Sequence, residues 1–462
     1  MNVPSYALDA VSRLRAGGYA AFLVGGCVRD SLMGRVPGDY DVATSARPEQ
    51  TEAVFAGERI IETGLKHGTV TLLLDGHPVE ITTFRTDGAY SDHRHPDEVR
   101  FAAQIEDDLA RRDFTVNAMA WSPETGLVDP CGGQDDLARK RIRCVGDPDR
   151  RFDEDALRIL RAMRFASVLG FDLDPATAAS ALAKKDLLEA VSRERIAVEL
   201  VKLVCGPDVR RVVCGFWPIL AVPVPELAPM AGFDQRSKYH CYDVLTHCAV
   251  AAETVRPDPI LRLAALLHDC GKPACFTMDR DGTGHFYGHG QISADLTKTI
   301  LTRLRFDNDT IRRVTDLVAL HDYPLDPEPG KPPRAIKRLL GKLGTEDFFR
   351  LLALKRADSL AHDPGYRARA ALCDRVEALT RELLAEQACF RVKDLAVNGR
   401  DLIALGIPEG PAVGRTLNAL LEAVLGEEVP NERDALLALA RSVDRRQLTM
   451  ATSRHTTVEN LP

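Results

Sequence analysis

Two aspartates that lie two positions apart are the first residues in this chain whose spacing suggests chemistry. Asp39 and Asp41 stand in the stretch PGDYDVAT, with Tyr40 between them. Since side chains alternate along a strand, both carboxylates are expected on one face and Tyr40 on the other. Paired hard oxygen ligands that leave room for phosphates suit Mg²⁺, which can promote phosphoryl transfer. Taken alone, the pair indicates either a polar strand edge or a magnesium site.

A phosphate-binding turn is predicted just before these aspartates. In LVGGCVRD, residues 23–30, a strand is expected to end in Gly25 and Gly26, and a helix is expected to follow. Glycines let backbone amides approach phosphate oxygens, and a helix N-terminus favours anions. Arg29, in the first helical turn, can add a charged fork. A GG turn alone is a weak signal, but together with the aspartates it predicts a nucleoside triphosphate site.

Further polar residues could belong to the same site. Glu80, in VEITTF, is a candidate third carboxylate if its strand lies beside that of Asp41; otherwise it is an ordinary exposed strand acid. The stretch RRDFTVNAMA supplies Arg112, Asp113 and Asn117, which suit triphosphate and ribose contacts but could also be surface residues. Both interpretations stay open for each of these residues.

The stretch EDALR contains a pair that could recognise a base. Asp155 and Arg158 lie three residues apart, hence next to each other on one helix face. Asp155 only accepts hydrogen bonds and Arg158 only donates them, an order that matches cytosine and adenine and opposes uracil and guanine. A mispaired polar edge is costly, so such a pair could be selective. The alternative, which the residues alone favour, is a surface ion pair worth roughly 0.2–0.5 kcal/mol.

Histidines and aspartates spread over residues 240–358 form a second constellation. Their order, one His, then His-Asp, two more His and an Asp, falls on expected helices. Imidazole with carboxylate suits a mono- or dinuclear site for a transition metal such as Mn, Fe, Ni or Co. Four of these residues would form a core site and His289 and His321 would extend it. The core residues are His247, His268, Asp269 and Asp358.

An α+β fold is expected to position both sets. Residues 1–145 are predicted to form a small mixed α/β head, since they alternate between β-rich runs and short helical stretches. The remainder is expected to be helical: a neck over 146–229, a body over 230–385 and a tail over 386–462. The strands are expected at 20–24, 40–44, 69–86 (a hairpin about Asp75-Gly76) and 115–121. A helix is expected at 105–112, a mobile loop at 86–101 and a Pro-rich linker at 216–229.

The bulk properties limit the class of protein. The chain has 462 residues, 45% hydrophobic and 27% charged, with a net charge of −7, which is ordinary for a multidomain soluble protein. No apolar window is long enough to span a membrane, and the scattered cysteines indicate reduced thiols, so a cytoplasmic location is expected. Residues 139–164 carry nine basic and five acidic residues, a local charge of +4 that could contact a polyanion.

Six motifs in one order resemble the class II tRNA nucleotidyltransferase and poly(A) polymerase family. They cover roughly the first 200 residues: GGCVRDSLMGRVPGDYDVATSA, FRTDGAYSDHRHP, RRDFTVNAMA, DPCGGQDDLARKRIR, RFDEDALRILRAMRFA and SRERIAVEL. The resemblance implies metal binding by Asp39 and Asp41 and a flexible loop at residues 86–98, where His93 departs from the expected glycine. It also implies a nucleotide-binding set that comprises Gly25, Gly26, Arg29, Arg112, Asp113, Asn117, Glu154, Asp155, Arg158, Arg161 and Arg164.

The function implied by this resemblance is template-independent addition of CMP and AMP to the 3′ end of tRNA, from CTP and ATP, with release of pyrophosphate. In that family an EDxxR motif serves as the template for the incoming base, which favours the same role for Asp155 and Arg158. Glu154 would orient Arg158 or the neighbouring backbone. Members that add only A, only CC or poly(A) share these motifs, so those activities stay open as alternatives. The sequence does not indicate an oligomeric state.

The histidine constellation resembles the HD phosphohydrolase superfamily, with LLHDCGKP as its strongest motif. The resemblance implies metal-dependent hydrolysis of phosphate esters, as a main or second activity. A retained helical domain that helps to bind tRNA is the alternative, and the sequence does not separate the two.

Overall fold

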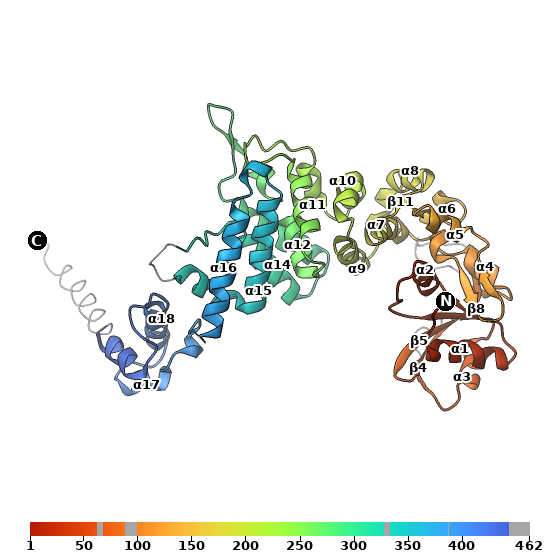
Figure 1. The fold of residues 1–462 in the computed structure, drawn as a ribbon, viewed down its shortest axis with the longest axis horizontal. Helices are drawn as coiled ribbons and strands as arrows, with labels where there is room; N and C mark the ends of the chain where they lie inside the picture. Colours follow the sequence, from red (N-terminus) through yellow and green to blue (C-terminus); the bar gives the residue numbers. More distant parts are fainter. Residues whose placement is uncertain (62–67, 88–98, 328–332, 387, 443–462) are drawn as a thin grey trace, which may run out of the picture.

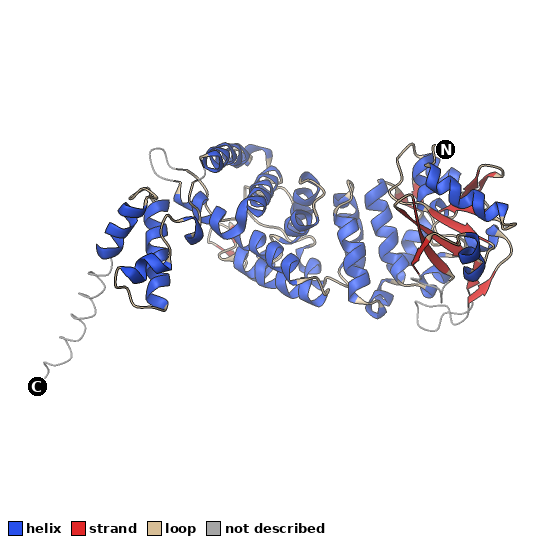
Figure 2. Ribbon diagram, turned by 90° about the horizontal axis from the view of Figure 1, so that it is seen from below, coloured by secondary structure: helices blue, strands red, loops and turns tan. Residues whose placement is uncertain are grey.

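Strands gather at one end of an elongated molecule, and helices make up most of the remainder (Figures 1 and 2). The computed structural model describes residues 1–61, 68–87, 99–327, 333–386 and 388–442. The N-terminal head lies at one end of the array and α17 and α18 lie near the other, with the neck and body helices between them (Figure 1). The expected α+β class, with a small head followed by helices, is confirmed.

The head is built on one mixed sheet with the strand order β3-β4-β5-β2-β1-β8-β9. Its strands are β1 (Ala21–Val24), β2 (Asp41–Thr44), β3 (Arg59–Ile61), β4 (Thr69–Leu74), β5 (His77–Thr83), β8 (Ala120–Ser122) and β9 (Gly126–Val128). Both faces of the sheet are covered. One face packs Leu23, Val42 and Ile81 with α1 (Ser5–Ala16), while Phe22 and Ala43 on the other pack with α4 (Ile105–Ala110). The other head helices are α2 (Gly26–Leu32), α3 (Pro48–Val54) and α5 (Gly133–Ala138).

The predicted hairpin is confirmed, because β4 and β5 pair antiparallel about Asp75 and Gly76. Both turn residues have positive φ, 49° and 79°, as a two-residue type I′ turn requires. Two other expectations were wrong in part. The ends of the 86–101 loop form paired strands, and the first three residues of the 115–121 strand form a 3₁₀ turn, so that the strand begins only at Ala120. These elements are β6 (Arg85–Asp87), β7 (Val99–Phe101) and η2 (Thr115–Asn117); residues 88–98, including His93, lie outside the described residues.

Helices account for most of the neck and body. Several begin at an aspartate whose carboxylate accepts from the first-turn amides, as Asp174 and Asp258 do, each followed by a proline. The α-helices are α6 (Pro148–Glu154), α7 (Leu157–Leu169), α8 (Pro175–Ala183), α9 (Arg193–Val204), α10 (Val209–Leu220), α11 (Val244–Thr254), α12 (Pro259–Leu267), α13 (His289–Arg303), α14 (Asn308–Leu320), α15 (Arg334–Leu360) and α16 (Arg369–Ala385). Shorter elements are β10 (Arg141–Ile142), β11 (Asp172–Leu173), β12 (Thr277–Met278), β13 (Gly284–His285), η3 (Lys185–Ala190), η4 (Pro225–Met230), η5 (Lys272–Ala274) and η6 (Pro364–Tyr366).

The Pro-rich stretch 216–229 is not a linker, which corrects the sequence prediction. Its first part completes α10, with a kink at Phe216, and its last part enters η4. Ile219, Leu220 and Leu227 are fully buried in the same apolar cluster as the neck and body helices. The prolines shape tight turns inside a packed region, because the apolar residues between them have a core to join.

The same apolar cluster continues into the head. Phe114 and Ile142, on the head side of residue 145, are fully buried in it together with neck and body residues. The tail has a separate small core around Leu402, Leu420 and Leu436 and contains η7 (Val392–Asp394), α17 (Gly399–Ala404) and α18 (Pro411–Leu425). Among the described residues, no helix has the length and apolar content needed to cross a membrane.

Candidate functional site

The predicted carboxylates converge where β2 and β5 lie side by side. The two strands are parallel, and Asp41 is the direct partner of Glu80. Partners in neighbouring strands share a face of the sheet, so the condition for including Glu80 is met. β2 begins at Asp41, which leaves the exposed Asp39 just before the strand rather than within it.

Crowding of negative charge marks Asp41 as the centre of this group. Burial, followed by repulsion from Asp39 and Glu80, raises the pKa of the Asp41 carboxyl to about 6, and Arg112 opposes the shift. Three carboxylates that lie close together suit a divalent cation, which would neutralise their charge. The donor set consists of hard oxygens, as Mg²⁺ prefers. These residues therefore fit the predicted metal.

The glycine turn lies next to Asp41 and to an arginine. Val24, the last residue of β1, pairs with Asp41, and α2 begins two residues later at Gly26. Gly25 between them has φ +76°, and a Cβ there would lie 2.9 Å from Arg112 Nη1. The positive φ favours glycine, and any side chain there would displace the Arg112 guanidinium. Arg112 is itself oriented by Asp108, with Nη2 3.1 Å from Oδ2.

A chain of hydrogen bonds joins the turn to the neck through the other predicted nucleotide-binding residues. Arg29 Nη1 donates to Asn117 Oδ1 at 2.6 Å, and Asn117 Nδ2 donates to Asp113 Oδ1 at 3.3 Å. Arg161, on α7, donates to Asp113 Oδ2 at 2.6 Å. Arg164 lies outside this chain: it pairs with Glu199 at 2.9 Å, and its guanidinium lies 3.9 Å from the centroid of the Phe165 ring.

Replacing Asp113 by Asn is expected to destabilise the protein by about 2 kcal/mol at pH 7. Burial would raise the pKa of Asp113, but Arg161 overcomes it and lowers the pKa to about 2. Because the folded-state pKa lies below the unfolded value, this stability is complete above about pH 4 and is lost as pH falls toward 2. Urea unfolding at pH 7 and at pH 3 would show the loss and its decrease in acid.

The matched control for that measurement is Asp172→Asn. Asp172 also faces an arginine, Arg211, but is 86% exposed, so little change is expected. Equal destabilisation by both substitutions would contradict the role given to Asp113.

The base-recognition pair is not arranged as the sequence predicted. Asp155 interrupts the helix: α6 ends at Glu154, Asp155 is extended (φ −141°, ψ 103°), and α7 begins at Leu157. Asp155 accepts from Arg195 at 2.9 Å and from the Leu157 amide, so it is not paired with Arg158. Its carboxylate accepts from the amide of the first residue of α7, a local bond to the backbone that favours a break in the helix at this point.

Glu154 is the partner that holds Arg158. Their side chains meet at 2.7 Å, and Arg158 also donates to the backbone carbonyls of Arg151 and Arg111. The Glu154–Arg158 contact agrees with the sequence prediction. Arg158 is only 9% exposed and is fixed from both the head and the neck.

The histidines and aspartates of the second constellation meet between α11, α12, α13, α14 and α15. Their ligand atoms form two groups, each within 4.8 Å, and Asp269 belongs to both. The first group combines it with three residues of the predicted core, and the second adds the two predicted extending histidines. We call these six residues the histidine–aspartate cluster: His247, His268, Asp269, His289, His321 and Asp358.

The tautomers of three cluster histidines are fixed by backbone carbonyls. Nδ1 of His268, His289 and His321 lies 2.8, 2.8 and 2.6 Å from carbonyl oxygens of their own turns. A carbonyl only accepts, so each Nδ1 carries the proton and each Nε2 lone pair faces the cluster. Histidines that bind a metal through one ring nitrogen typically donate the other ring N–H to a carbonyl in this way. Nε2 atoms also face each other, as in His289 and His321 at 3.1 Å.

The two carboxylate oxygens of Asp269 face different histidines of the cluster. Its Oδ2 lies 3.3 Å from His268 Nε2, and its Oδ1 lies 3.4 Å from His289 Nε2 and 3.5 Å from His321 Nε2. Neither oxygen accepts a well-aligned hydrogen bond among the described residues, although Lys272 Nζ makes an ion pair at 2.6 Å. Buried carboxylate oxygens without such partners are uncommon, and they fit a metal ligand. The cluster therefore suits a dinuclear transition-metal site.

Two further histidines adjoin the cluster and were not predicted as ligands. His240 and His362 form a third group with His247, and their Nε2 atoms are 3.2 Å apart. His362 follows Asp358 by four residues, a helical spacing that could have pointed to it. Lys272, in the quoted LLHDCGKP, is also buried here and contacts His240 at 3.3 Å.

The head sheet, its acidic edge and the adjacent glycine turn together define a nucleotidyltransferase. Three protein families match parts of the chain. The family described as "Poly A polymerase head domain" matches residues 21–143. The family "Probable RNA and SrmB- binding site of polymerase A" matches residues 170–217, and "tRNA nucleotidyltransferase domain 2 putative" matches residues 289–440.

Relatives at full length narrow the class. A CCA-adding enzyme of Geobacillus thermodenitrificans is 35% identical over 442 residues, 94% of this chain and 95% of that protein. A CCA-adding enzyme of Streptococcus pyogenes serotype M4 is 33% identical over 446 residues, which are 96% of this chain and 98% of that protein. The crystal structure of the Bacillus stearothermophilus enzyme in complex with CTP matches 97% of this chain and 100% of that one, at TM-score 0.73 and 31% identity. The chain belongs to the CCA-adding enzyme family.

Proposed function

We propose that this protein adds CMP and AMP to the 3′ end of tRNA, with CTP and ATP as donors and pyrophosphate as the leaving group. The observation that carries this proposal is the edge at which Asp41 and Glu80 pair beside the Gly25 turn and Arg112. Full-length relatives named CCA-adding enzymes support the choice of product. The location proposed with this activity is the cytoplasm, since tRNA, CTP and ATP are its substrates.

Each group at this edge has a role in the reaction. The backbone at Gly25 and Gly26 and the guanidinium of Arg112 hold the triphosphate. Asp39 and Asp41 would hold Mg²⁺, which neutralises phosphate charge and lowers the barrier to attack by the tRNA 3′-hydroxyl on the α-phosphorus. Glu80 keeps that site strongly negative. Arg29, Asn117, Asp113 and Arg161 fix the position of the turn relative to the neck.

Base selection falls to the break between α6 and α7. Arg158 donates and Asp155 accepts, so an incoming C or A can pair with them and U or G cannot. Both side chains are held by other groups, Arg158 by Glu154 and Asp155 by Arg195, which orients them in advance. The sequence predicted both residues on one helix face, whereas Asp155 lies in the break and Arg158 lies in α7.

The product is tested with three tRNA substrates that lack CCA, end in C and end in CC. CTP and ATP are supplied singly and together. Two C additions followed by one A addition, each only on the matching substrate, are expected. Extension by A alone, by C alone or into a long A tail would assign the chain to one of the alternative activities.

We further propose that the histidine–aspartate cluster binds transition metal and hydrolyses phosphate esters as a second activity. The Nε2 atoms of the cluster histidines face inward, and the two oxygens of Asp269 lie near different histidines. Both observations support this function over a purely structural helical domain. The bound metals would supply a nucleophilic oxygen at neutral pH. The chain's own residues provide the ligands, and Lys272 adds a buried positive charge.

The double variant His268→Ala, Asp269→Asn is expected to lose most of its bound transition metal and to keep CCA addition. The two residues belong to the body, whereas the carboxylates of the transfer site belong to the head. Metal content by mass spectrometry and phosphate release from p-nitrophenyl phosphate test the cluster, and CCA addition reports that the variant is folded. Unchanged metal content would rule out the assignment of these ligands.

A further inference from the structure

Three guanidinium groups lie around one buried aromatic ring where the head meets the neck. The ring belongs to Phe165 on α7, which is only 6% exposed. The guanidinium carbon of Arg164 lies 3.9 Å from the ring centroid, that of Arg29 lies at 5.4 Å and that of Arg161 at 5.5 Å. A cation within about 6 Å of an aromatic ring is attracted to it, most strongly where water is excluded. The ring is therefore a common support for basic side chains of α2 and α7.

The same ring lies beside the glycine turn that is proposed to bind phosphate. Arg29 belongs to α2, the helix that begins at this turn, and its Nη2 would be 3.7 Å from a Cβ on Gly26. Phe114, in the stretch that also carries Arg112, meets the Phe165 ring edge to face at 5.7 Å. Phe165 thus contacts residues of both the head and the neck next to the triphosphate site.

Arg164 keeps its hydrogen-bond donors unused. Its side chain is 13% exposed and makes no hydrogen bond to another described residue. Its Nε lies 2.9 Å from Glu199 Oε2, but the two atoms are not aligned for a hydrogen bond. Burial lowers the pKa of the Arg164 guanidinium; Glu199 opposes the shift, and Arg161 adds to it. A buried guanidinium without hydrogen-bond partners is costly, so an anion at its free edge would be stabilising.

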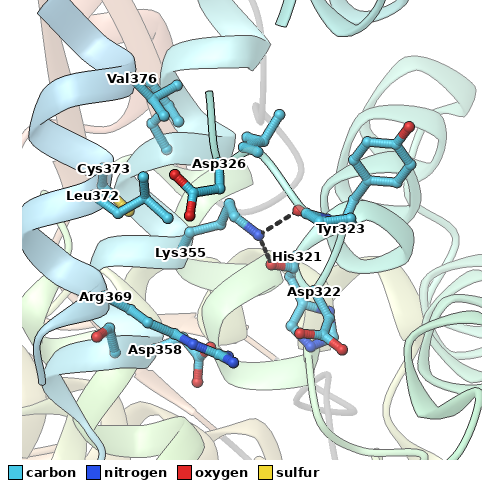
Figure 3. A pocket seen from close by; sticks show the side chains of 14 residues that line it. His321, Asp322, Tyr323, Asp326, Lys355, Asp358, Arg369, Leu372, Cys373 and Val376 are labelled. Atoms are coloured by element: carbon cyan, nitrogen blue, oxygen red, sulfur yellow. Dashed lines mark hydrogen bonds between the residues drawn. The ribbon is translucent and has the colours of Figure 1, made fainter. Parts of the chain in front are cut away.

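Basic side chains in the helical body, by contrast, use their donors on the protein. Arg262, which is 4% exposed, donates to three backbone carbonyls. The ammonium of Lys355 donates to the carbonyls of His321 and Tyr323 (Figure 3). Arg164 is supported by a ring instead. A guanidinium held over a ring keeps its N–H groups available, because the ring offers no oxygen or nitrogen acceptor.

We propose that Phe165 positions Arg164 to bind the triphosphate of the incoming nucleotide. The ring fixes the guanidinium where head and neck meet and leaves its donors for phosphate oxygens. The inference rests on the nucleotidyl transfer proposed above and adds a positioning residue to its phosphate site. Because Phe165 touches no reacting atom, it acts on the affinity for the nucleotide and not on the chemical step.

Phe165→Leu is expected to raise KM for CTP and ATP about tenfold and to change kcat little. Leucine keeps the apolar bulk but removes the ring, and tenfold is the order expected for one desolvated cation–π contact. The inhibition constant of pyrophosphate should rise by the same factor, since pyrophosphate has phosphates but no base. The preference for CMP over UMP should not change, because Asp155 and Arg158 are proposed to select the base. Steady-state addition to tRNAs that lack CCA or end in CC measures these quantities.

Phe171→Leu is the matched control. Phe171 is 2% exposed in the same apolar cluster, and among the described residues no basic side chain lies over its ring. The two substitutions should lower the melting temperature similarly, whereas only Phe165→Leu should raise KM. Phe165→Met is measured alongside, so that the result does not depend on one replacement.

A double-mutant cycle with Arg164→Ala tests whether the ring acts through this guanidinium. In the Arg164→Ala background, Phe165→Leu is expected to raise KM by less than about twofold. A tenfold rise in both backgrounds would overturn the proposal, as would an unchanged KM in Phe165→Leu or a rise that Phe171→Leu matches. If the parent extends no tRNA, the proposed function fails, and calorimetric titration with CTP and pyrophosphate still tests the role of Phe165. A parent that binds neither compound would contradict both.

Discussion

Asp41→Asn is expected to abolish nucleotide addition and to leave the fold at least as stable as that of the parent. Asp39 and Glu80 both disfavour the ionised form of Asp41. Asp41 lies in the strand next to the glycine turn that is proposed to bind phosphate. Without its charge the site would lose metal affinity, so a decrease of about 10³-fold or more in CMP addition is expected. Single-turnover extension of a tRNA that lacks CCA, with Mg²⁺ varied, measures this effect.

Asp41→Asn is expected to raise the free energy of unfolding at pH 7. The pKa of Asp41 rises from 3.8 to about 6 on folding, so the folded protein binds more protons than the unfolded chain between these values. Stability attributed to Asp41 is therefore greatest below about pH 4 and falls as pH rises through 6. Asn mimics the neutral form, and at pH 7 in the absence of metal it should add on the order of 2 kcal/mol to the free energy of unfolding.

Asp75→Asn is the matched control, because Asp75 lies in the exposed turn of the same sheet and asparagine is accepted at its positive φ. It should change neither activity nor the pH dependence of stability. An Asp41→Asn protein that still extends tRNA would disprove the metal assignment. One that unfolds more easily than the parent at pH 7 would disprove the proposed charge crowding.

Arg158→Lys is expected to lower CMP and AMP incorporation at least about 100-fold and to narrow the preference over UMP and GMP. Lysine keeps the positive charge but cannot form the planar fork that reaches Glu154 and two carbonyls. Buried polar groups would then lack partners, and discrimination based on hydrogen bonding would decrease. Incorporation of each of the four nucleotides, supplied singly to a tRNA that ends before CCA, measures the preference.

Arg150→Lys provides the comparison for this variant. Arg150 contacts the same carboxylate, with Nε 3.1 Å from Glu154 Oε1, but its side chain is 71% exposed. Little change in rate or base preference is expected. If Arg158→Lys retained the nucleotide preference of the parent, base selection would have to depend on other residues.

Turns were predicted correctly where the backbone conformation strongly favours one residue type. Asp75-Gly76 predicted the hairpin because positive φ at both positions favours such residues, and the GG turn predicted the entry to α2. The partnership of Asp41 with Glu80 could only be stated as a condition, since strand order depends on contacts distant in sequence. The break at Asp155 was missed because Phe152, Ala156 and Leu160 keep the four-residue spacing of one helix across it. Only the bonds of Asp155 to Arg195 and to the Leu157 amide reveal the break.

The histidine–aspartate cluster was easier to predict than its surroundings. Metal ligands are recognisable by residue type and order, so all six lie together as expected. Four exposed tyrosines line a cavity beside the cluster, and nothing in the sequence marks them, because an exposed and a buried tyrosine look alike there; they are Tyr239, Tyr287, Tyr323 and Tyr366. The 216–229 stretch was misjudged for a similar reason: its prolines suggested a linker, and the burial of Leu220 and Leu227 depends on partners far along the chain.

The apolar cluster that runs from Phe114 to Leu383 limits how this protein can be divided or recombined. A fragment that ends at residue 145 would expose Phe114 and Ile142, which are fully buried against the neck. If the head were exchanged for that of a relative, its residues at the positions of Phe114 and Ile142 would have to pack against a neck from a different protein. The head is thus a module in its sequence motifs but not in its packing, and the piece of chain that can be exchanged as a unit includes the neck.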